Sequence, residues 1–282
     1  MSGDGDGVRV GVVGHIEWVH FVRVPALPDA GAIAHADAFW SEAAGGGGVA
    51  AVQLARLAGG GELFTALGRD EHGRRSVERM EQLGVGCEVA ERDMATRQAI
   101  TFLDGDGERT ITTLGARLEP KGSDALPWAT LAGLDGIYFT AGDADALRAA
   151  RAARVLVATP RAGAVLGPDV VLDALVLSAH DAGERALAER VGAAAVAHVM
   201  TEGAEGGSYR TRDGATGRWS APPPPAPGGD AYGCGDSFAA GLTYGLAAGM
   251  GLDAALALAA RCGAECRSGS GPYERQLGRD AI

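Results

Sequence analysis

Residues 229–241 carry the strongest signal for fold and chemistry in this 282-residue chain, and they read Gly229-Asp-Ala-Tyr-Gly-Cys-Gly-Asp-Ser-Phe-Ala-Ala-Gly241. Glycines at 233 and 235 let the backbone turn sharply before an apolar helix, which we expect to begin near Ser237. Free backbone N–H groups and the helix dipole make such a junction attract negative charge. The stretch therefore predicts an anion site suited to a phosphoryl group.

Asp236 places a carboxylate inside this positively polarised turn. A loop that only bound phosphate would gain nothing from a negative side chain there, so accepting a proton is the role that fits. The alternative is a simple helix cap, because Asp and Ser both cap helices well. The surrounding sequence favours the chemical role.

Bulk composition indicates a packed globular protein, with 46% hydrophobic and 22% charged residues. The length suits one large α/β domain. A net charge of -11 and the absence of a dense Lys/Arg run argue against a nucleic-acid partner. Lys121 is the only lysine, so a lysine-dependent phosphate loop has one candidate at most.

The cysteines and the N-terminus indicate a cytoplasmic protein. Cys87, Cys234, Cys262 and Cys266 lack the spacing of a zinc ligand set and are expected to be reduced thiols. Residues 1–7 are acidic and Gly-rich, unlike a secretory signal. The Ala-rich stretch 239–260 contains Asp253 and several glycines, so we expect a buried helix pair and no membrane partner.

Strand-like and helix-like segments alternate along most of the chain. Strands are expected at 8–13, 63–67, 137–140, 154–158, 175–178 and 198–201, and helices at 49–57, 71–83, 144–153 and 184–192. Turn chemistry predicts hairpins at 99–114 and 208–219. This alternation predicts a mostly parallel sheet.

Residues 230–242 resemble the C-terminal signature of the PfkB (ribokinase-like) carbohydrate kinases, usually Asp-Thr-x-Gly-Ala-Gly-Asp, with Cys234 in place of Ala. Residues 44–59 are similar to the N-terminal signature of that family, and residues 66–73 to its Gly-x-Asp-x-x-Gly continuation. Two signatures in the correct order make the resemblance specific, and it extends over nearly the whole chain.

The resemblance implies a ribokinase-like three-layer α/β/α core with a mostly parallel sheet and a small β-sheet lid. Residues 1–14, 46–87 and 116–282 would form the nucleotide-binding core. Residues 15–45 and 88–115 would form the lid over the substrate site. The inserted lid pieces interrupt one domain and do not create a second one.

The resemblance also implies ATP-dependent transfer of the γ-phosphoryl group to a hydroxyl of a small molecule, with Mg²⁺ as cofactor. Asp236 would act as the base, and the catalytic anion hole would consist of the amides of Gly233, Cys234 and Gly235. Residues expected at the nucleotide are Thr201, Gly203, Gly206, Asp230, Arg261 and Ser178. Asp181 ends the segment that stands in place of the family's magnesium-linked Asn-x-x-Glu motif and is the metal candidate.

The acceptor is less defined than the nucleotide. The resemblance assigns it Gly45, Gly46 and Gly47. Further candidates come from position in the chain: Arg109 on the hairpin, and Glu17, with His15 and His20 as alternatives, in the loop after the first strand. Two polar positions of typical sugar kinases are Val19 and Ala50 here, so a sugar, a sugar acid and a nucleoside all stay open. Arg97 and Arg109 lie on the hairpin expected above the site, where either would reach a phosphate or a carboxylated acceptor.

Two other functions remain alternatives. The loss of polar residues at Val19 and Ala50 would suit a non-catalytic nucleotide or metabolite sensor with the kinase fold. A dinucleotide-dependent oxidoreductase would suit the sheet pattern, but residues 11–16 lack the spaced glycines. Aromatic residues in the lid segments would either stack on a ligand ring or form a homodimer interface through the lid, and the second role is favoured: Trp18, Phe21, Phe39 and Trp40.

Overall fold

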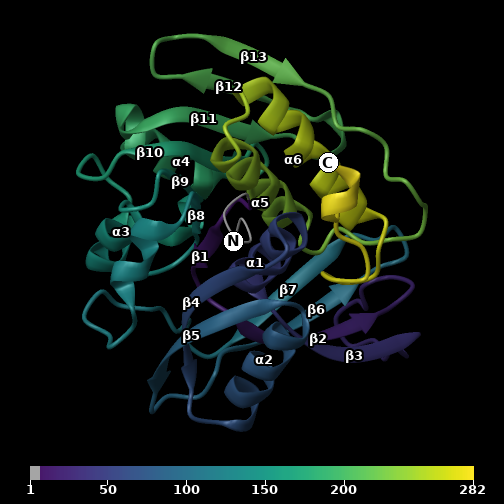
Figure 1. The fold of residues 1–282 in the computed structure, drawn as a ribbon. Coiled ribbons are helices and arrows are strands. Elements are labelled where there is room, and N and C mark those ends of the chain that lie inside the picture. Colours follow the sequence, from purple (N-terminus) through teal and green to yellow (C-terminus); the bar gives the residue numbers. More distant parts are fainter. Residues whose placement is uncertain (1–6) are drawn as a thin grey trace.

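A nine-stranded sheet forms the centre of the molecule in the computed structural model, which describes residues 7–282 (Figure 1). Its strand order is β13-β12-β11-β10-β9-β8-β1-β4-β5. The strands are β1 (Val10–Val13), β4 (Gly61–Gly68), β5 (Val85–Arg92), β8 (Gly136–Phe139), β9 (Val155–Ala158), β10 (Leu172–Ser178), β11 (Ala195–Thr201), β12 (Gly207–Thr211) and β13 (Thr216–Trp219). Apart from β12, which is antiparallel to both neighbours, the strands run parallel, as expected.

Helices cover both faces of this sheet, because successive residues of each strand point to opposite sides. Val12 joins a buried cluster with α1 (Gly45–Ala58), α2 (Glu71–Gln82), α5 (Cys234–Ala247) and α6 (Leu252–Arg267). Val13 joins a second cluster with α3 (Ala144–Ala150), α4 (Ala182–Val191) and the short 3-10 helices η1 (Trp128–Gly133) and η2 (Pro160–Val165). The predicted three-layer α/β/α core is confirmed.

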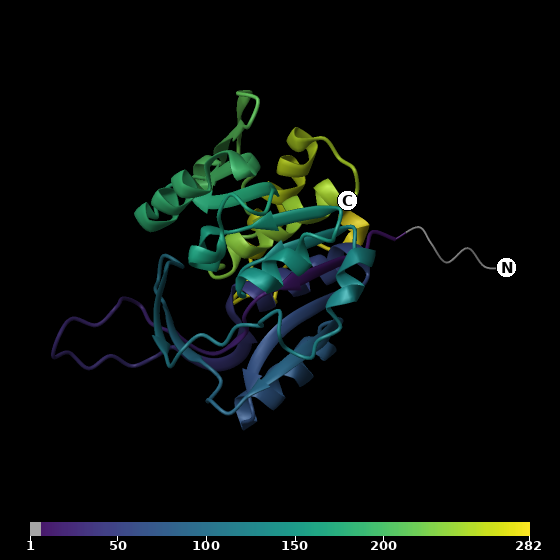
Figure 2. The ribbon, with the colours of Figure 1, turned by 90° about the vertical axis from the view of Figure 1, so that its left-hand side faces the viewer.

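A separate four-stranded sheet, with the order β3-β2-β6-β7, is built from the segments predicted to form the lid, and we call it the lid sheet. Its strands are β2 (Glu17–Arg23), β3 (Ala38–Ala44), β6 (Gln98–Leu103) and β7 (Arg109–Leu114). The loop between β2 and β3 extends away from the body of the protein (Figure 2). The lid thus comes from two distant chain segments held together by the parallel pairing of β2 with β6.

The expected boundary between core and lid needs one correction. Strand β5 pairs with β4 along its whole length in the large sheet, so residues 88–92 belong to that sheet and not to the lid. Main-chain hydrogen bonds to a buried strand decide this, whereas the alternating sequence there resembled a lid strand. The rest of the division into core and lid stays a prediction.

Two helices begin earlier than expected, and both contribute to the site. Helix α5 begins at Cys234 and not near Ser237, because Gly233 adopts the left-handed conformation that precedes it (φ 80°). Helix α1 begins at Gly45 and not near Val49, so the glycine run forms its first turn. These helix starts move free N–H groups toward the carboxyl edge of the sheet.

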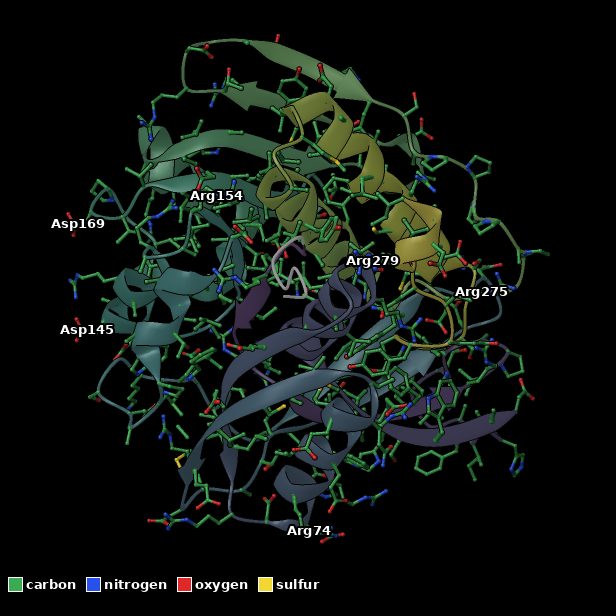
Figure 3. All side chains as sticks on the ribbon, viewed as in Figure 1. Arg74, Asp145, Arg154, Asp169, Arg275 and Arg279 are labelled. Atoms are coloured by element: carbon green, nitrogen blue, oxygen red, sulfur yellow. The ribbon has the colours of Figure 1, made fainter. Side chains whose placement is uncertain are left out.

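The parallel strands bring several loops to one edge of the sheet. The loops that follow β11, β10, β9, β8 and β1 lie there in this order, because these strands are consecutive neighbours. Ligands of open parallel sheets bind at this edge. Charged side chains such as Asp145 and Asp169 lie at the periphery instead (Figure 3). Within residues 7–282, no helix is long and apolar enough to cross a membrane.

Candidate active site

The glycine turn before α5 presents backbone amides to open space. No side chain caps this end of the helix, and the N–H groups of its first turn have no intrahelical acceptors. A Cβ atom added at Gly235 would meet nothing within 4 Å, whereas one added at Gly233 would lie 2.9 Å from Val49 Cγ1. The turn is therefore packed on its inner side and open on its outer side, as an anion site requires.

Asp236 lies where the first turns of α5 and α1 meet. A Cβ atom added at Gly46 would be 2.9 Å from Asp236 Oδ1, so the backbone of α1 approaches the carboxylate directly. At Gly47 an added Cβ would lie 2.6 Å from the carbonyl oxygen of His15. An added Cβ would displace the carboxylate at Gly46 and clash with backbone at Gly47. The two glycines thus let two helix N-termini, both positively polarised, lie beside the carboxylate.

The pKa of the half-buried Asp236 carboxyl is raised from its ordinary value of 3.8, chiefly because burial disfavours the charged form. Arg161 and Arg109 oppose this effect, and the negative charge of Glu184 adds to it. A carboxylate with a raised pKa is a stronger base than an ordinary one. Asp236 is thus suited to accept a proton from a hydroxyl group.

Arg161 and Glu184 were not predicted from the sequence, yet the charges of both act on Asp236. Arg161 Nε is 2.7 Å from Glu184 Oε1, and the backbone N–H of Ser178 donates to Glu184 Oε2 at 2.8 Å. The pKa of Arg161 is raised, with the charges of Asp236 and Glu184 outweighing burial. Arg161 follows strand β9 at its carboxyl end, and this position was a signal that could have identified it.

The structure brings together four of the residues predicted to contact the nucleotide. Ser178 and Thr201 end the neighbouring strands β10 and β11 and are paired in register. Gly203 and Gly206 follow in the next loop, both with positive φ (63° and 90°). A Cβ atom at Gly206 would clash with the carbonyl oxygen of Trp219, so that glycine is also required by close packing.

Asp181 caps helix α4. Its Oδ1 accepts hydrogen bonds from the N–H groups of Gly183 (2.9 Å) and Glu184 (3.1 Å), which leaves Oδ2 without a capping bond. In the part of the chain that the structure describes, no group of three or more His, Cys, Asp or Glu side chains could hold a metal ion. A metal-linked role of Asp181 stays a prediction.

Asp230 and Arg261, also expected at the nucleotide, have other partners. Asp230 is fully buried and accepts hydrogen bonds from the N–H groups of Gly271 (2.8 Å) and Tyr232 (3.1 Å). Arg23 of the lid approaches the same carboxylate at 3.4 Å. Arg261 is exposed on α6 and donates to the carbonyl of Ala281. These contacts are structural, and nucleotide contact by either residue stays a prediction.

The residues predicted at the acceptor surround the start of α1. Glu17 packs against Gly45, where an added Cβ would be 3.1 Å from Glu17 Cγ. Glu17 Oε2 lies 3.3 Å from Arg97 Nε. Burial raises the pKa of the Glu17 carboxyl, while Arg97 and Arg117 oppose the shift. Burial together with three nearby arginines lowers the pKa of His15 to about 3, so its imidazole is neutral.

Arg109 lies nearer the anion turn than Arg97 does. Its Nη1 donates to the carbonyl oxygen of Ala231 at 3.1 Å, and its charge acts on Asp236. By contrast, Val19 and Ala50 are fully buried in the core and offer no polar atom to a ligand. At both positions the apolar side chain therefore contributes to core packing instead of contacting a ligand.

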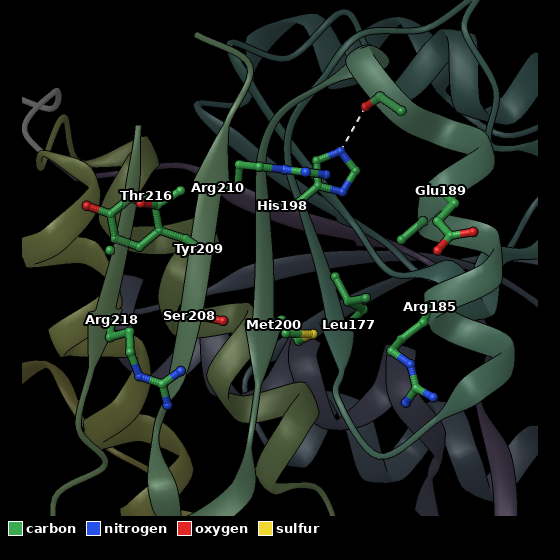
Figure 4. A pocket seen from close by; sticks show the side chains of 13 residues that line it. Leu177, Arg185, Glu189, His198, Met200, Ser208, Tyr209, Arg210, Thr216 and Arg218 are labelled. Carbon is green, nitrogen blue, oxygen red and sulfur yellow. Dashed lines mark hydrogen bonds between the residues drawn. The ribbon is translucent and has the colours of Figure 1, made fainter. Parts of the chain in front are cut away.

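A surface hollow lies elsewhere, between α4 and strands β11 to β13 (Figure 4). Leu177 and Met200 contribute to its lining, and His198 donates from Nε2 to the carbonyl oxygen of Gly192 at 2.8 Å. None of the predicted site residues lines it. The chemistry is therefore assigned to the carboxyl edge of the sheet and not to this hollow.

A mostly parallel sheet with an open glycine turn and a carboxylate at its carboxyl edge, together with a small separate sheet, defines a ribokinase-like protein. The chain belongs to the pfkB family of carbohydrate kinases, since the model of that family matches residues 9–276. No curated protein matches the chain.

Solved structures share this fold at low sequence identity. A putative ribokinase from Agrobacterium tumefaciens superposes with a TM-score of 0.80 at 21% identity, covering 97% of this chain and 95% of that one. The adenosine kinase from Sinorhizobium meliloti gives 0.76 at 19% identity, with 98% of both chains covered. The Arabidopsis thaliana ribokinase complexed with ribose and ATP gives 0.75 at 17% identity, covering 98% and 97%.

Proposed function

We propose that the protein transfers the γ-phosphoryl group of ATP to a hydroxyl group of a sugar or related small molecule. The observation that carries this proposal is the position of Asp236, inside an open anion turn and against the first turn of α1. A base and an anion-binding site share one place, which is what phosphoryl transfer to a hydroxyl needs.

In the proposed reaction, the acceptor hydroxyl donates its proton to the Asp236 carboxylate as its oxygen attacks the γ-phosphorus. The bond from that phosphorus to the bridging oxygen breaks, and ADP leaves. Amides of Gly233, Cys234 and Gly235 stabilise the charge of the transferring group. Arg161 is positioned by Glu184 to add a positive charge at the same place.

The nucleotide would extend from Asp236 toward the loops after β10 and β11. Ser178, Thr201 and the glycines at 203 and 206 lie along that edge. The similar ribokinase from Cryptococcus neoformans was solved in complex with ADP, which supports nucleotide use by this fold. A Mg²⁺ ion on the phosphates would neutralise charge, with Asp181 as its outer support through Oδ2.

The acceptor class is proposed from the similar structures only in broad terms. The Arabidopsis ribokinase was complexed with ribose, and the Burkholderia thailandensis nucleoside kinase with inosine. A sugar kinase is our first proposal, and a nucleoside kinase is the second. A non-catalytic sensor is disfavoured because the turn from Gly233 to Asp236 is intact.

The decisive experiment measures ADP release from MgATP with a panel of sugars, sugar acids and nucleosides. Asp236→Asn should abolish acceptor-dependent release while ADP binding, measured by calorimetry, is retained. Asp145→Asn is the matched control, because Asp145 also lies in the first turn of a helix but is exposed. If Asp236→Asn kept wild-type turnover, the assignment of the base would be wrong.

A homodimer through the lid is proposed as well. Five large apolar side chains are exposed on the lid or its protruding loop: Leu27 at 44%, Ile33 at 89%, Phe39 at 65%, Ile111 at 42% and Leu114 at 44% exposure. Apolar side chains exposed together are typical of a surface that another chain covers. Sedimentation of the wild type and of an Ile33→Asp variant would test whether a second copy binds there.

A further inference from the structure

Three polar atoms close to the Asp236 site are buried and have no hydrogen-bond partner in the protein. They are His15 Nδ1, Glu17 Oε2 and Arg97 Nε. Buried polar atoms are almost always paired, so a group of unpaired atoms in one place calls for an explanation. A bound ligand that forms hydrogen bonds with these atoms is a direct explanation.

These atoms belong to side chains that surround one short strip of backbone. An added Cβ atom at Gly46 would lie 2.9 Å from Asp236 Oδ1 and 3.7 Å from His15 Cε1. At Gly45 it would lie 3.3 Å from His15 Cδ2 and 3.1 Å from Glu17 Cγ. The two glycines are neighbours, with Cα atoms about 3.8 Å apart. Asp236, His15 and Glu17 therefore follow one another around the start of α1.

Arg97 extends this row from the lid. Trp18 of β2 pairs with Gln98 of β6, so Glu17 and Arg97 each precede a paired residue and meet at the end of the lid sheet. Their charged groups are 3.3 Å apart, and the side chains are 9% and 19% exposed. Neither Glu17 Oε2 nor Arg97 Nε makes a hydrogen bond, in spite of this proximity. Both atoms therefore keep hydrogen-bonding capacity that a ligand would use.

The other arginines near His15 already have carboxylate partners. Arg117 Nε donates to Glu119 at 2.6 Å, and Arg161 Nε donates to Glu184 at 2.7 Å. Arg97 is the guanidinium of this group that keeps a buried donor unpaired. An arginine stays charged at all working pH values, and its planar fork matches a carboxylate with two parallel hydrogen bonds.

We propose that the acceptor is a hydroxy-carboxylate, that is, a sugar acid, whose carboxylate binds Arg97 while one hydroxyl meets Asp236. Glu17 and His15 bind the hydroxyls between these ends. The neutral imidazole of His15 suits a hydroxyl, and the fully buried apolar side chains of Val19 and Ala50 add no contact that would favour a neutral sugar. This inference deepens the proposed function and rests on it.

Matched pairs of ligands test the inference. Gluconate is compared with glucose, and ribonate with ribose, by calorimetry without ATP and by ADP release from MgATP. We expect the acid of at least one pair to bind and to have a KM about 10- to 100-fold below that of its neutral partner, which is the range for a hydrogen bond to a charged group.

Variants of Arg97 then locate the carboxylate. Arg97→Gln should raise the KM for the acid about 10- to 100-fold more than it raises the KM for the neutral partner. Arg97→Lys keeps the charge and should restore part of the loss, a result that a purely structural role would not produce. Arg69→Gln is the control, because Arg69 also pairs with carboxylates but is 60% exposed.

The outcomes separate this inference from the proposed function. If the neutral partner is phosphorylated as well as or better than its acid in both pairs, or if Arg97→Gln affects acid and neutral partner equally, the sugar-acid inference is overturned and the kinase function stands. If no member of the panel is phosphorylated, the kinase proposal fails. Binding of the acid without ATP, lost in Arg97→Gln, would then still support the acid site.

Discussion

Gly46→Ala is the substitution that most directly tests whether the position of Asp236 controls the reaction. The added methyl would lie 2.9 Å from Asp236 Oδ1, whereas ordinary contacts begin at 3.4 Å. The carboxylate must therefore move by about 0.5 Å, the difference between these distances. A displacement of about 1 Å in an active site costs on the order of 100-fold in rate. We expect kcat to fall about tenfold, equivalent to about 1.4 kcal/mol.

Stability should change little in the same variant. Alanine is favoured over glycine within a helix by about 1 kcal/mol, which offsets the cost of moving one flexible side chain. The KM for ATP should also stay within about twofold, because Gly46 lies against Asp236 and not against the loops after β10 and β11. A change confined to the acceptor KM would instead assign Gly46 to substrate contact.

Gly48→Ala provides the matched control. Gly48 lies in the same first turn of α1, but an added Cβ there would be 3.4 Å from Tyr273 Oη, an ordinary contact. Steady-state kinetics and thermal melting of both variants complete the test. Control of the rate by the position of Asp236 would be contradicted if Gly46→Ala kept wild-type kcat, or if Gly48→Ala lost as much activity as Gly46→Ala.

Four further predictions concern pH and stability. Burial raises the pKa of Asp236 above 3.8, so kcat/KM should fall as the pH drops through that raised pKa, in a pH–rate profile. A carboxyl group with a raised pKa stabilises the fold at low pH and loses that contribution as the pH rises. Asp236→Asn should therefore have a higher melting temperature than the wild type at pH 8, and a smaller increase in melting temperature at pH 5. Asp230→Ala leaves two buried N–H groups and Arg23 unpaired, and urea unfolding should show a loss of roughly 3–5 kcal/mol; near-normal stability would contradict the structural role. Gly233→Ala introduces a side chain at φ 80° and a 2.9 Å contact, so the free energy of unfolding should drop by at least about 1–2 kcal/mol.

Much of the fold could be predicted from the sequence, because local signals there agree with the global architecture. The alternation of β-branched and amphipathic segments indicated a parallel sheet between helices, and the hairpin at 99–114 was found at 98–103 and 109–114. The lid boundary near residue 88 was wrong because strand β5 has the alternation of a half-exposed strand, and only its pairing with β4 assigns it to the large sheet. Register between distant strands is a property of the whole sheet.

The glycine turn and the carboxylate at Asp236 could be predicted from the sequence, since a turn, a helix start and an acidic residue are encoded within a few positions. Three contacts became visible in the folded chain alone: Gly46 lies against this carboxylate, Glu184 orients Arg161, and Glu17 lies beside Arg97. Each of these contacts joins segments far apart in the chain. Such contacts follow from strand order and from the angle at which helices approach the sheet, and no local pattern carries that information.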